Sequence, residues 1–166
     1  MTGENNRKNY SVSVGLDRTL GATLRVSPDE GENDVAIVEH TLGAEKLAAP
    51  LHRHSHEDEI SYIIDGTMGV QEGEEVSTVS AGEIAVKRRG VWHTFWNPGP
   101  GELRFLEIIT PGQFARYFER ADEILPEQGE PDAEAAKELA ELHEEFSLEM
   151  RPESVPELLE EHDLDR

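Results

Sequence analysis

The sequence contains no cysteine among its 166 residues. Disulfide frameworks, thiolate metal sites and cysteine nucleophiles are therefore excluded. No apolar run approaches the ~20 residues that a membrane-spanning helix needs. The N-terminal segment MTGENNRKNY also lacks the apolar stretch of a secretory signal. These absences lead us to expect a cytoplasmic protein without a membrane partner.

Positive charges are also few, because 15 Lys and Arg stand against 36 Asp and Glu and give a net charge of −21. Such a field repels phosphate backbones, so we expect no nucleic-acid partner. The basic cluster formed by Lys87, Arg88 and Arg89 is too small to change that expectation. Arg outnumbers Lys by 11 to 4, and this composition resembles that of halophilic proteins. We hypothesise adaptation to high salt, which screens the repulsion between acidic groups.

Only 36% of the residues are apolar, but the β-branched and aromatic ones gather in short runs between Val35 and Ile109. Turn signals separate these runs, a pattern typical of an antiparallel β-sandwich or β-barrel. Two further strands are expected within residues 10–26. The other predicted strands span residues 35–42, 60–64, 67–71, 76–79, 83–86, 94–96 and 103–109.

After residue 111 the apolar spacing changes from two to about three and a half, which indicates helices. The first helix should pack on the sheet through the face that carries Phe114, Tyr117, Phe118, Ala121 and Leu125. Asp132 is the predicted N-cap of a second helix, and Ser154 forms a capping-box pattern with Glu157 before a third. Residues 117–166 hold 18 of the 36 acids. We therefore divide the chain into a β-domain, residues 1–111, and an acidic helical C-terminal extension, residues 112–166.

The histidines show the most informative spacing in the chain. His52, His54 and His56 alternate, so an extended strand would point all three to one face. An acidic triplet, residues 57–59, follows them, and His93 lies about 40 residues later at the start of another predicted strand. Imidazole nitrogens with a carboxylate oxygen suit a borderline divalent metal. Taken alone, the pattern also fits surface or hydrogen-bonded histidines.

Two motifs of polar residues and glycines stand 15 residues apart. They read His52-Arg53-His54-(x4)-Glu59-(x6)-Gly66 and Gly82-(x5)-Arg88-x-Gly90-(x2)-His93-(x3)-Asn97. Both resemble the motifs of the cupin superfamily. The segments PLHRHSHEDEISYIIDG and TPGQFARYFERADEIL are similar to small single-domain cupins described as quercetin 2,3-dioxygenase-like. Lys46 and Arg88 stand where the motifs have glycine and proline, and neither position binds metal.

The resemblance implies an all-β fold, a cupin jelly-roll β-barrel of two packed antiparallel sheets. It also implies that His52, His54, Glu59 and His93 converge on one divalent transition metal ion, which could be Fe, Mn, Ni, Cu, Co or Zn. Buried imidazoles cost stability unless they are partnered, which favours a cation among them. His56 competes with Glu59 for the fourth ligand position.

Strand parity predicts the residues around the metal. Ser61 and Ile63 share a face with Glu59, and Phe95 and Asn97 share a face with His93. With His56 at the mouth, these four side chains form the predicted substrate pocket. Glu57 and Asp58 are interpreted as solvated, and His40, His143 and His162 as structural or surface residues.

By the same resemblance, we expect a metal-dependent dioxygenase acting on a small oxygen-bearing aromatic or enol substrate, with Glu59 as both metal ligand and catalytic proton acceptor. A metal-dependent isomerase or lyase would use the same residues. A non-catalytic small-molecule binding or sensing cupin is the other alternative, since a fold with a metal site does not define a reaction. Similar cupins commonly pair, so a homodimer is expected.

Overall fold

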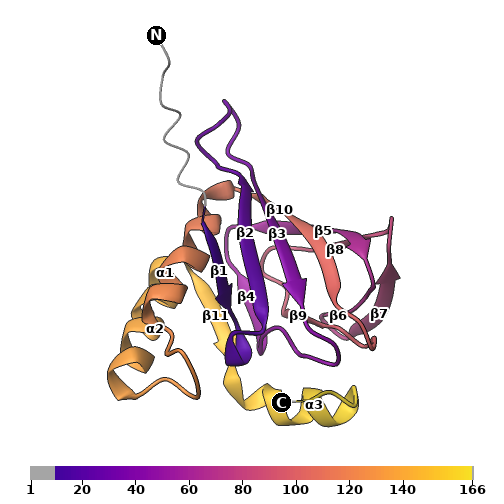
Figure 1. The fold of residues 1–166 in the computed structure, drawn as a ribbon. Coiled ribbons are helices and arrows are strands. Elements are labelled where there is room, and N and C mark those ends of the chain that lie inside the picture. The colour runs from indigo at the N-terminus through magenta and orange to yellow at the C-terminus, as the bar shows by residue number, and fades with distance from the viewer. Residues whose placement is uncertain (1–9, 166) are drawn as a thin grey trace.

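The computed structural model describes residues 10–165, which form two antiparallel β-sheets packed face to face, with helices along one side (Figure 1). The start of the chain, where no secretory signal is expected, lies outside the described residues. The first sheet has the order β1 (Ser11–Val14), β2 (Leu20–Val26), β3 (Ala36–Leu42), β10 (Leu103–Thr110), β5 (Asp58–Asp65) and β8 (Ile84–Lys87). The second has the order β11 (Leu148–Arg151), β4 (Leu51–His54), β9 (His93–Trp96), β6 (Thr67–Glu72) and β7 (Glu75–Ser80).

The predicted jelly-roll sandwich is confirmed, and every predicted strand is present within a few residues of its expected bounds. Alternation explains why: along β3, Ala36, Val38 and Leu42 point inward and are fully buried, while the residues between them are half-buried. The inward faces of both sheets join in one core that includes Ile63 and Phe105. This double layer is the rigid frame that carries the candidate site.

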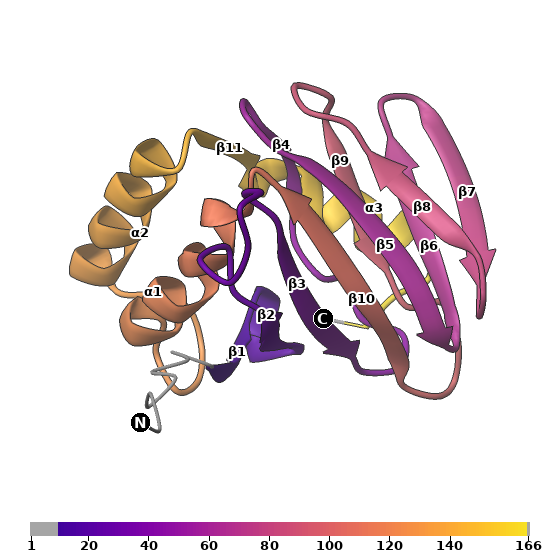
Figure 2. The same ribbon diagram turned by 90° about the horizontal axis from the view of Figure 1, so that it is seen from above.

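One short helical segment lies between β1 and β2, and the others follow β10. They are η1 (Leu16–Arg18), η2 (Gly112–Ala115), α1 (Arg116–Ile124), α2 (Ala133–Glu145), η3 (Pro152–Ser154) and α3 (Val155–Glu161). Helices α1 and α2 stand together beside the end of the sandwich (Figure 2). None of the described helices is long and apolar enough to cross a membrane.

The predicted packing of the first helix is confirmed. Phe114, Tyr117, Phe118 and Ala121 are buried in the main core. Asp132 is the N-cap of α2, because its Oδ1 accepts a hydrogen bond from the Ala135 amide at 2.9 Å. The predicted capping box at α3 is wrong. The Ser154 hydroxyl instead donates to the Arg151 carbonyl at 2.7 Å and accepts from the Leu51 amide at 3.0 Å.

Strand β11 was not expected within the extension. It pairs with β4, so that Leu148 lies opposite His54 and Met150 opposite His52. Helix α3 also returns to the sandwich, where Leu158 packs with Trp96 in a second small cluster. The extension is therefore not purely helical and adds a strand beside two of the candidate metal ligands. The division of the chain at residue 111 stays a prediction.

Candidate metal centre

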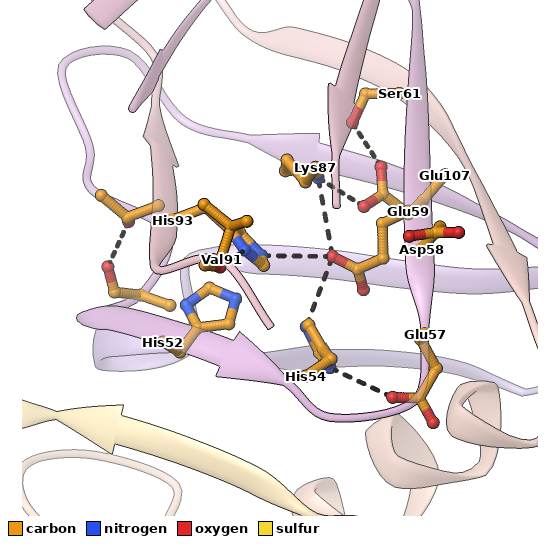
Figure 3. A network of polar contacts seen from close by, with 12 residues as sticks. His52, His54, Glu57, Asp58, Glu59, Ser61, Lys87, Val91, His93 and Glu107 are labelled. Carbon is orange, nitrogen blue, oxygen red and sulfur yellow. Dashed lines mark hydrogen bonds and ion pairs between the residues drawn. The ribbon is translucent and has the colours of Figure 1, made fainter. Parts of the chain in front are cut away.

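Four buried side chains from three strands converge between the two sheets (Figure 3). His52 and His54 come from β4, His93 from β9 and Glu59 from β5. Each offers one ligand atom, and these four atoms lie within 4.8 Å of one another. His52 pairs directly with His93 across β4 and β9, whereas Glu59 reaches the cluster from the opposite sheet. The structure thus brings together the four residues predicted as ligands.

Backbone carbonyls orient two of the three imidazole rings. Nδ1 of His52 lies 2.8 Å from the Pro50 carbonyl oxygen, and Nδ1 of His93 lies 3.1 Å from that of Val91. A carbonyl oxygen only accepts, so Nδ1 carries the proton in both rings. Nε2 of each neutral ring is then left with a free lone pair. Nε2 of His93 is buried without a hydrogen-bond partner among the described residues.

The third ring, that of His54, is held between two carboxylates. Its Nε2 lies 3.4 Å from Oε2 of Glu59, and its Nδ1 lies 3.8 Å from Oε2 of Glu57. Within the described part of the chain, both nitrogens and this Glu57 oxygen are buried without a hydrogen bond. Glu57 is only 7% exposed, so its interpretation as solvated is wrong. It lies two residues before Glu59 and therefore shares its face.

His56 and Asp58 point away from the cluster. His56 is exposed, in the bend between β4 and β5, and is not part of the ligand group. Asp58 is half-buried and pairs with Arg89 at 3.3 Å. The alternation that begins at His52 stops at this bend. His56 therefore does not share the face of His52 and His54, whereas Glu59, on β5, faces the cluster again.

The electrostatics of the cluster favour a cation. Burial alone would raise the pKa of Glu59, but His54 and Lys87 outweigh burial and hold that pKa well below its usual range. Burial lowers the pKa of both His52 and His93, so these rings stay neutral. At His54 burial is outweighed by the neighbouring carboxylates, which raise its pKa. An ionised carboxylate among three imidazoles therefore draws positive charge into a buried space.

The donor set fits a divalent transition metal. Three imidazole nitrogens and one carboxylate oxygen are ligands that such metals use in proteins. Leaving buried nitrogens such as those of His54 and His93 without partners costs free energy, and coordination would remove that cost. His52, His54, Glu59 and His93 are thus suited to hold one ion.

A buried ion pair borders the cluster and was missed by the sequence analysis. Lys87 on β8 and Glu107 on β10 are both buried and pair with each other. The Ser61 hydroxyl donates to the second oxygen of Glu107, and Nζ of Lys87 lies 3.8 Å from Oε2 of Glu59 (Figure 3). Burial raises the pKa of Glu107 to about 7 despite its Lys87 partner.

The basic cluster seen in the sequence does not exist on the surface. Lys87 faces inward, opposite Glu59 in the β5–β8 register, while Arg88 pairs with Glu72 and Arg89 with Asp58. Alternation along β8 was the signal available, because Ala85 and Lys87 share one face. Strand β8 ends at Lys87, so the three consecutive cations do not share one strand face.

A small cavity of about 70 Å³ opens beside the cluster. Its polar lining comes from His40, His52, His54, Glu59 and Glu107. Phe95 lines it, as strand parity predicts. His40, interpreted as an ordinary structural histidine, is buried with Nδ1 2.9 Å from the Gly21 carbonyl oxygen. Burial lowers the pKa of His40 to about 4, so the ring is neutral.

Four of the predicted pocket residues lie elsewhere. Ser61 is bonded to Glu107, and Ile63 is fully buried in the core farther along β5. The amide of Asn97 donates to the carbonyls of Leu42, Gly43 and Gly101, so it braces a loop. His56 is exposed and does not line the cavity. Parity identifies which face a side chain occupies, but not how far along the barrel it lies.

Comparison with known proteins finds a family match for part of the chain. Residues 38–109 match the cupin domain family. The matched segment runs from β3 to β10 and includes His52, His54, Glu59 and His93. A comparison with curated proteins finds no match.

Solved structures share the cupin fold at low sequence identity. A predicted oxalate decarboxylase from Thermotoga maritima is 21% identical, with 61% of this chain and 92% of that chain covered and a TM-score of 0.55. A cupin-2 domain protein from Rhodospirillum rubrum is 19% identical, with coverages of 61% and 68% and a TM-score of 0.53. KdgF from Halomonas sp. is 16% identical, with coverages of 60% and 84% and a TM-score of 0.51. At these identities the likeness concerns the fold.

Proposed function

We propose that this protein is a metal-dependent cupin enzyme in which His52, His54, Glu59 and His93 hold one divalent transition metal ion. The observation that carries the proposal is the convergence of four buried ligand atoms within 4.8 Å, with nitrogens of His54 and His93 unpartnered among the described residues. When bound, such an ion supplies Lewis acidity toward a substrate oxygen. Fe, Mn, Ni, Cu, Co and Zn all accept this donor set.

The reaction that we propose is dioxygenation of a small oxygen-bearing aromatic or enol substrate, as the resemblance to quercetinase-like cupins implies. The aromatic rings of Phe95, Phe114 and Phe118 line the cavity and suit a planar apolar substrate. Glu59 lines the cavity with its carboxylate, so we assign it as the acceptor of the proton of a substrate hydroxyl. An isomerase or lyase, and a non-catalytic binding or sensing cupin, are the alternatives that the test below must exclude.

Oxygen consumption by the metal-loaded protein tests this function. We expect elemental analysis of protein purified without chelator to give about one transition metal ion per chain. Catechols, flavonols and enols should then cause oxygen uptake that stops when the metal is removed and returns on reconstitution. Binding without oxygen uptake or product would favour the non-catalytic alternative, whereas product without oxygen uptake would indicate an isomerase or lyase.

We also propose that two copies of the chain associate through the outer face of the six-stranded sheet. Two rows of outward apolar side chains cross this face, with Tyr62 between Ile84 and Leu106 in one row. In the next row Ile60 lies between Val86 and Ile108. Tyr62, Ile84 and Val86 are 41%, 56% and 43% exposed. A contiguous apolar patch of this kind marks an association surface.

Charge indicates a second copy as the occupant of this patch. Molecules with a net charge of −21 repel one another, so they can pair only through a face without unpaired acids. On the neighbouring strand β3, Glu39 is neutralised by Arg25 at 2.7 Å and Arg104 at 2.5 Å. A partner recruited by charge would be basic and would bind the acidic extension instead. A two-fold contact of this face with itself buries the apolar patch and brings no unpaired acids together.

Sedimentation of an Ile84→Glu variant tests the dimer. Because a buried charge on each copy would oppose association, we expect a mass near the 18.6 kDa of one chain, against twice that mass for the original protein. Val76→Glu is the matched control, since Val76 is 50% exposed but lies on β7 of the other sheet. A single-chain mass for the unaltered protein would contradict the proposal.

Adaptation to high salt and a cytoplasmic location also stay predictions.

A further inference from the structure

The cavity at the candidate metal centre is too small to hold more than the head group of an organic substrate. Its volume of about 70 Å³ compares with the ~300–1,000 Å³ of pockets that hold small organic ligands. It could accept a compact oxygen-bearing head group. Any larger part of a substrate therefore needs space outside this cavity.

That space exists in a second, larger pocket of about 440 Å³ beside the cavity. The two share five lining residues, namely Val14, Gly15, Ala49, Tyr117 and Met150. A common wall of this extent places the two hollows next to each other. The larger pocket lies between η1, α1, α2, the loop of residues 126–131 and β11.

The extension builds most of this outer pocket. Only Ala49 and Pro50 come from the cupin domain, residues 38–109. The loop that closes the pocket is held in place by Arg18, whose guanidinium donates to the carbonyls of Pro126 at 2.7 Å and Leu125 at 2.5 Å. Arg18 also pairs with Asp122 at 2.5 Å. The outer pocket is thus a formed structure rather than a gap between loosely placed segments.

The chemistry of the walls selects an apolar occupant. Leu16, Leu125 and Leu139 contribute aliphatic surface, and the charge of Arg18 is already paired. Nε2 of His143 lies 3.1 Å from the Tyr117 hydroxyl, so this polar pair satisfies itself. Such a surface gains free energy by burying hydrocarbon, and the acidic residues that also line it disfavour an anionic ligand.

We propose that the C-terminal extension forms a second substrate compartment, which receives the apolar tail of a substrate whose oxygen-bearing head reaches the metal centre. Tyr117 and Met150 stand at the common wall, where the tail would leave the inner cavity. The substrate class is a catechol or enol that carries an apolar chain. This inference rests on the proposed function for the head group, while the compartment itself can be tested without it.

The compartment is tested by measuring the Kd of 4-alkylcatechols, from methyl to hexyl, for the metal-loaded protein under argon. Each added methylene that becomes buried should lower Kd about fourfold. Leu139→Trp fills the outer pocket only, because Leu139 does not line the inner cavity. We expect this variant to bind catechol unchanged and to lose the gain with chain length. Val76→Trp, on the exposed surface of β7, should keep that gain.

A second probe separates this inference from the proposed function. The 13C-labelled methyl group of Met150 lies at the common wall, while Met68 is fully buried in the core and serves as an internal reference. We expect 1-hexanol, a tail without a chelating head, to shift the Met150 signal in the original protein but not in Leu139→Trp, with or without metal. No shift, or no effect of chain length in catechols that do bind, would overturn the compartment. A Met150 shift without catechol binding would contradict the proposed function alone.

Discussion

Glu59→Gln is expected to reduce the metal content from about one ion per chain to near zero, whereas His56→Ala leaves it unchanged. Glu59 supplies the anionic ligand, with Oε2 3.4 Å from Nε2 of both His54 and His93. His56 is exposed and lies outside the ligand group. The measurement is elemental analysis after dialysis, together with competition against a chelating dye. Equal losses in the two variants would mean that the ligand assignment is wrong.

We expect the metal content of Glu57→Gln to lie between those of Glu59→Gln and His56→Ala. The carboxylate of Glu57 is the one that faces Nδ1 of His54, the only ring of the three whose Nδ1 lacks a backbone carbonyl partner in the described structure. Carboxylates that orient a ligand histidine typically contribute about 10- to 100-fold to metal affinity. Because Gln keeps the shape and removes the charge, a loss in this range would identify an electrostatic role. Metal affinity equal to that of the original protein would show that Glu57 does not act on His54.

Lys87→Met is expected to lower the stability of the metal-free protein by about 3–5 kcal/mol, because it leaves Glu107 buried without its counter-ion. For a chain of this size such a loss corresponds to a fall in Tm of roughly 10 °C. Thermal unfolding followed by circular dichroism measures it. Arg88→Met is the matched control, since Arg88 is exposed and its pair with Glu72 should contribute about 1 kcal/mol or less.

The double variant Lys87→Met/Glu107→Met separates charge from packing. Removing both members of a buried pair avoids an uncompensated charge, so much of the lost stability should return. Equal melting temperatures for Lys87→Met and Arg88→Met would contradict the structural role of the buried pair. Working without metal keeps this test independent of the ligand experiment, even though Lys87 also lies 3.8 Å from Glu59.

Most strands between residues 36 and 110 could be predicted because their signals are local. A strand such as β3 alternates inward and outward with a period of two, and β-branched residues between turn signals mark its ends. The ligand group could be predicted as well, because His52 and His54 are neighbours on one strand and the motif spacing includes Glu59 and His93. The resemblance to cupins supplied the pairing of these distant segments, which spacing alone left open.

The sequence by itself thus determined the two-sheet class and the apolar face of the first helix, and the resemblance to cupins added the four converging residues. Only the tertiary structure decided that β11 would join β4, that Lys87 would meet Glu107, and that Glu57 would turn inward. Strand β11 follows its partner β4 by almost 100 residues, and pairing over such separations leaves no local trace. A periodic pattern also does not show how far along the barrel a side chain lies. Strand parity therefore predicted Phe95 correctly as a cavity residue, but it also predicted Ser61 and Ile63, which do not line the cavity. Register and depth depend on contacts across the whole molecule.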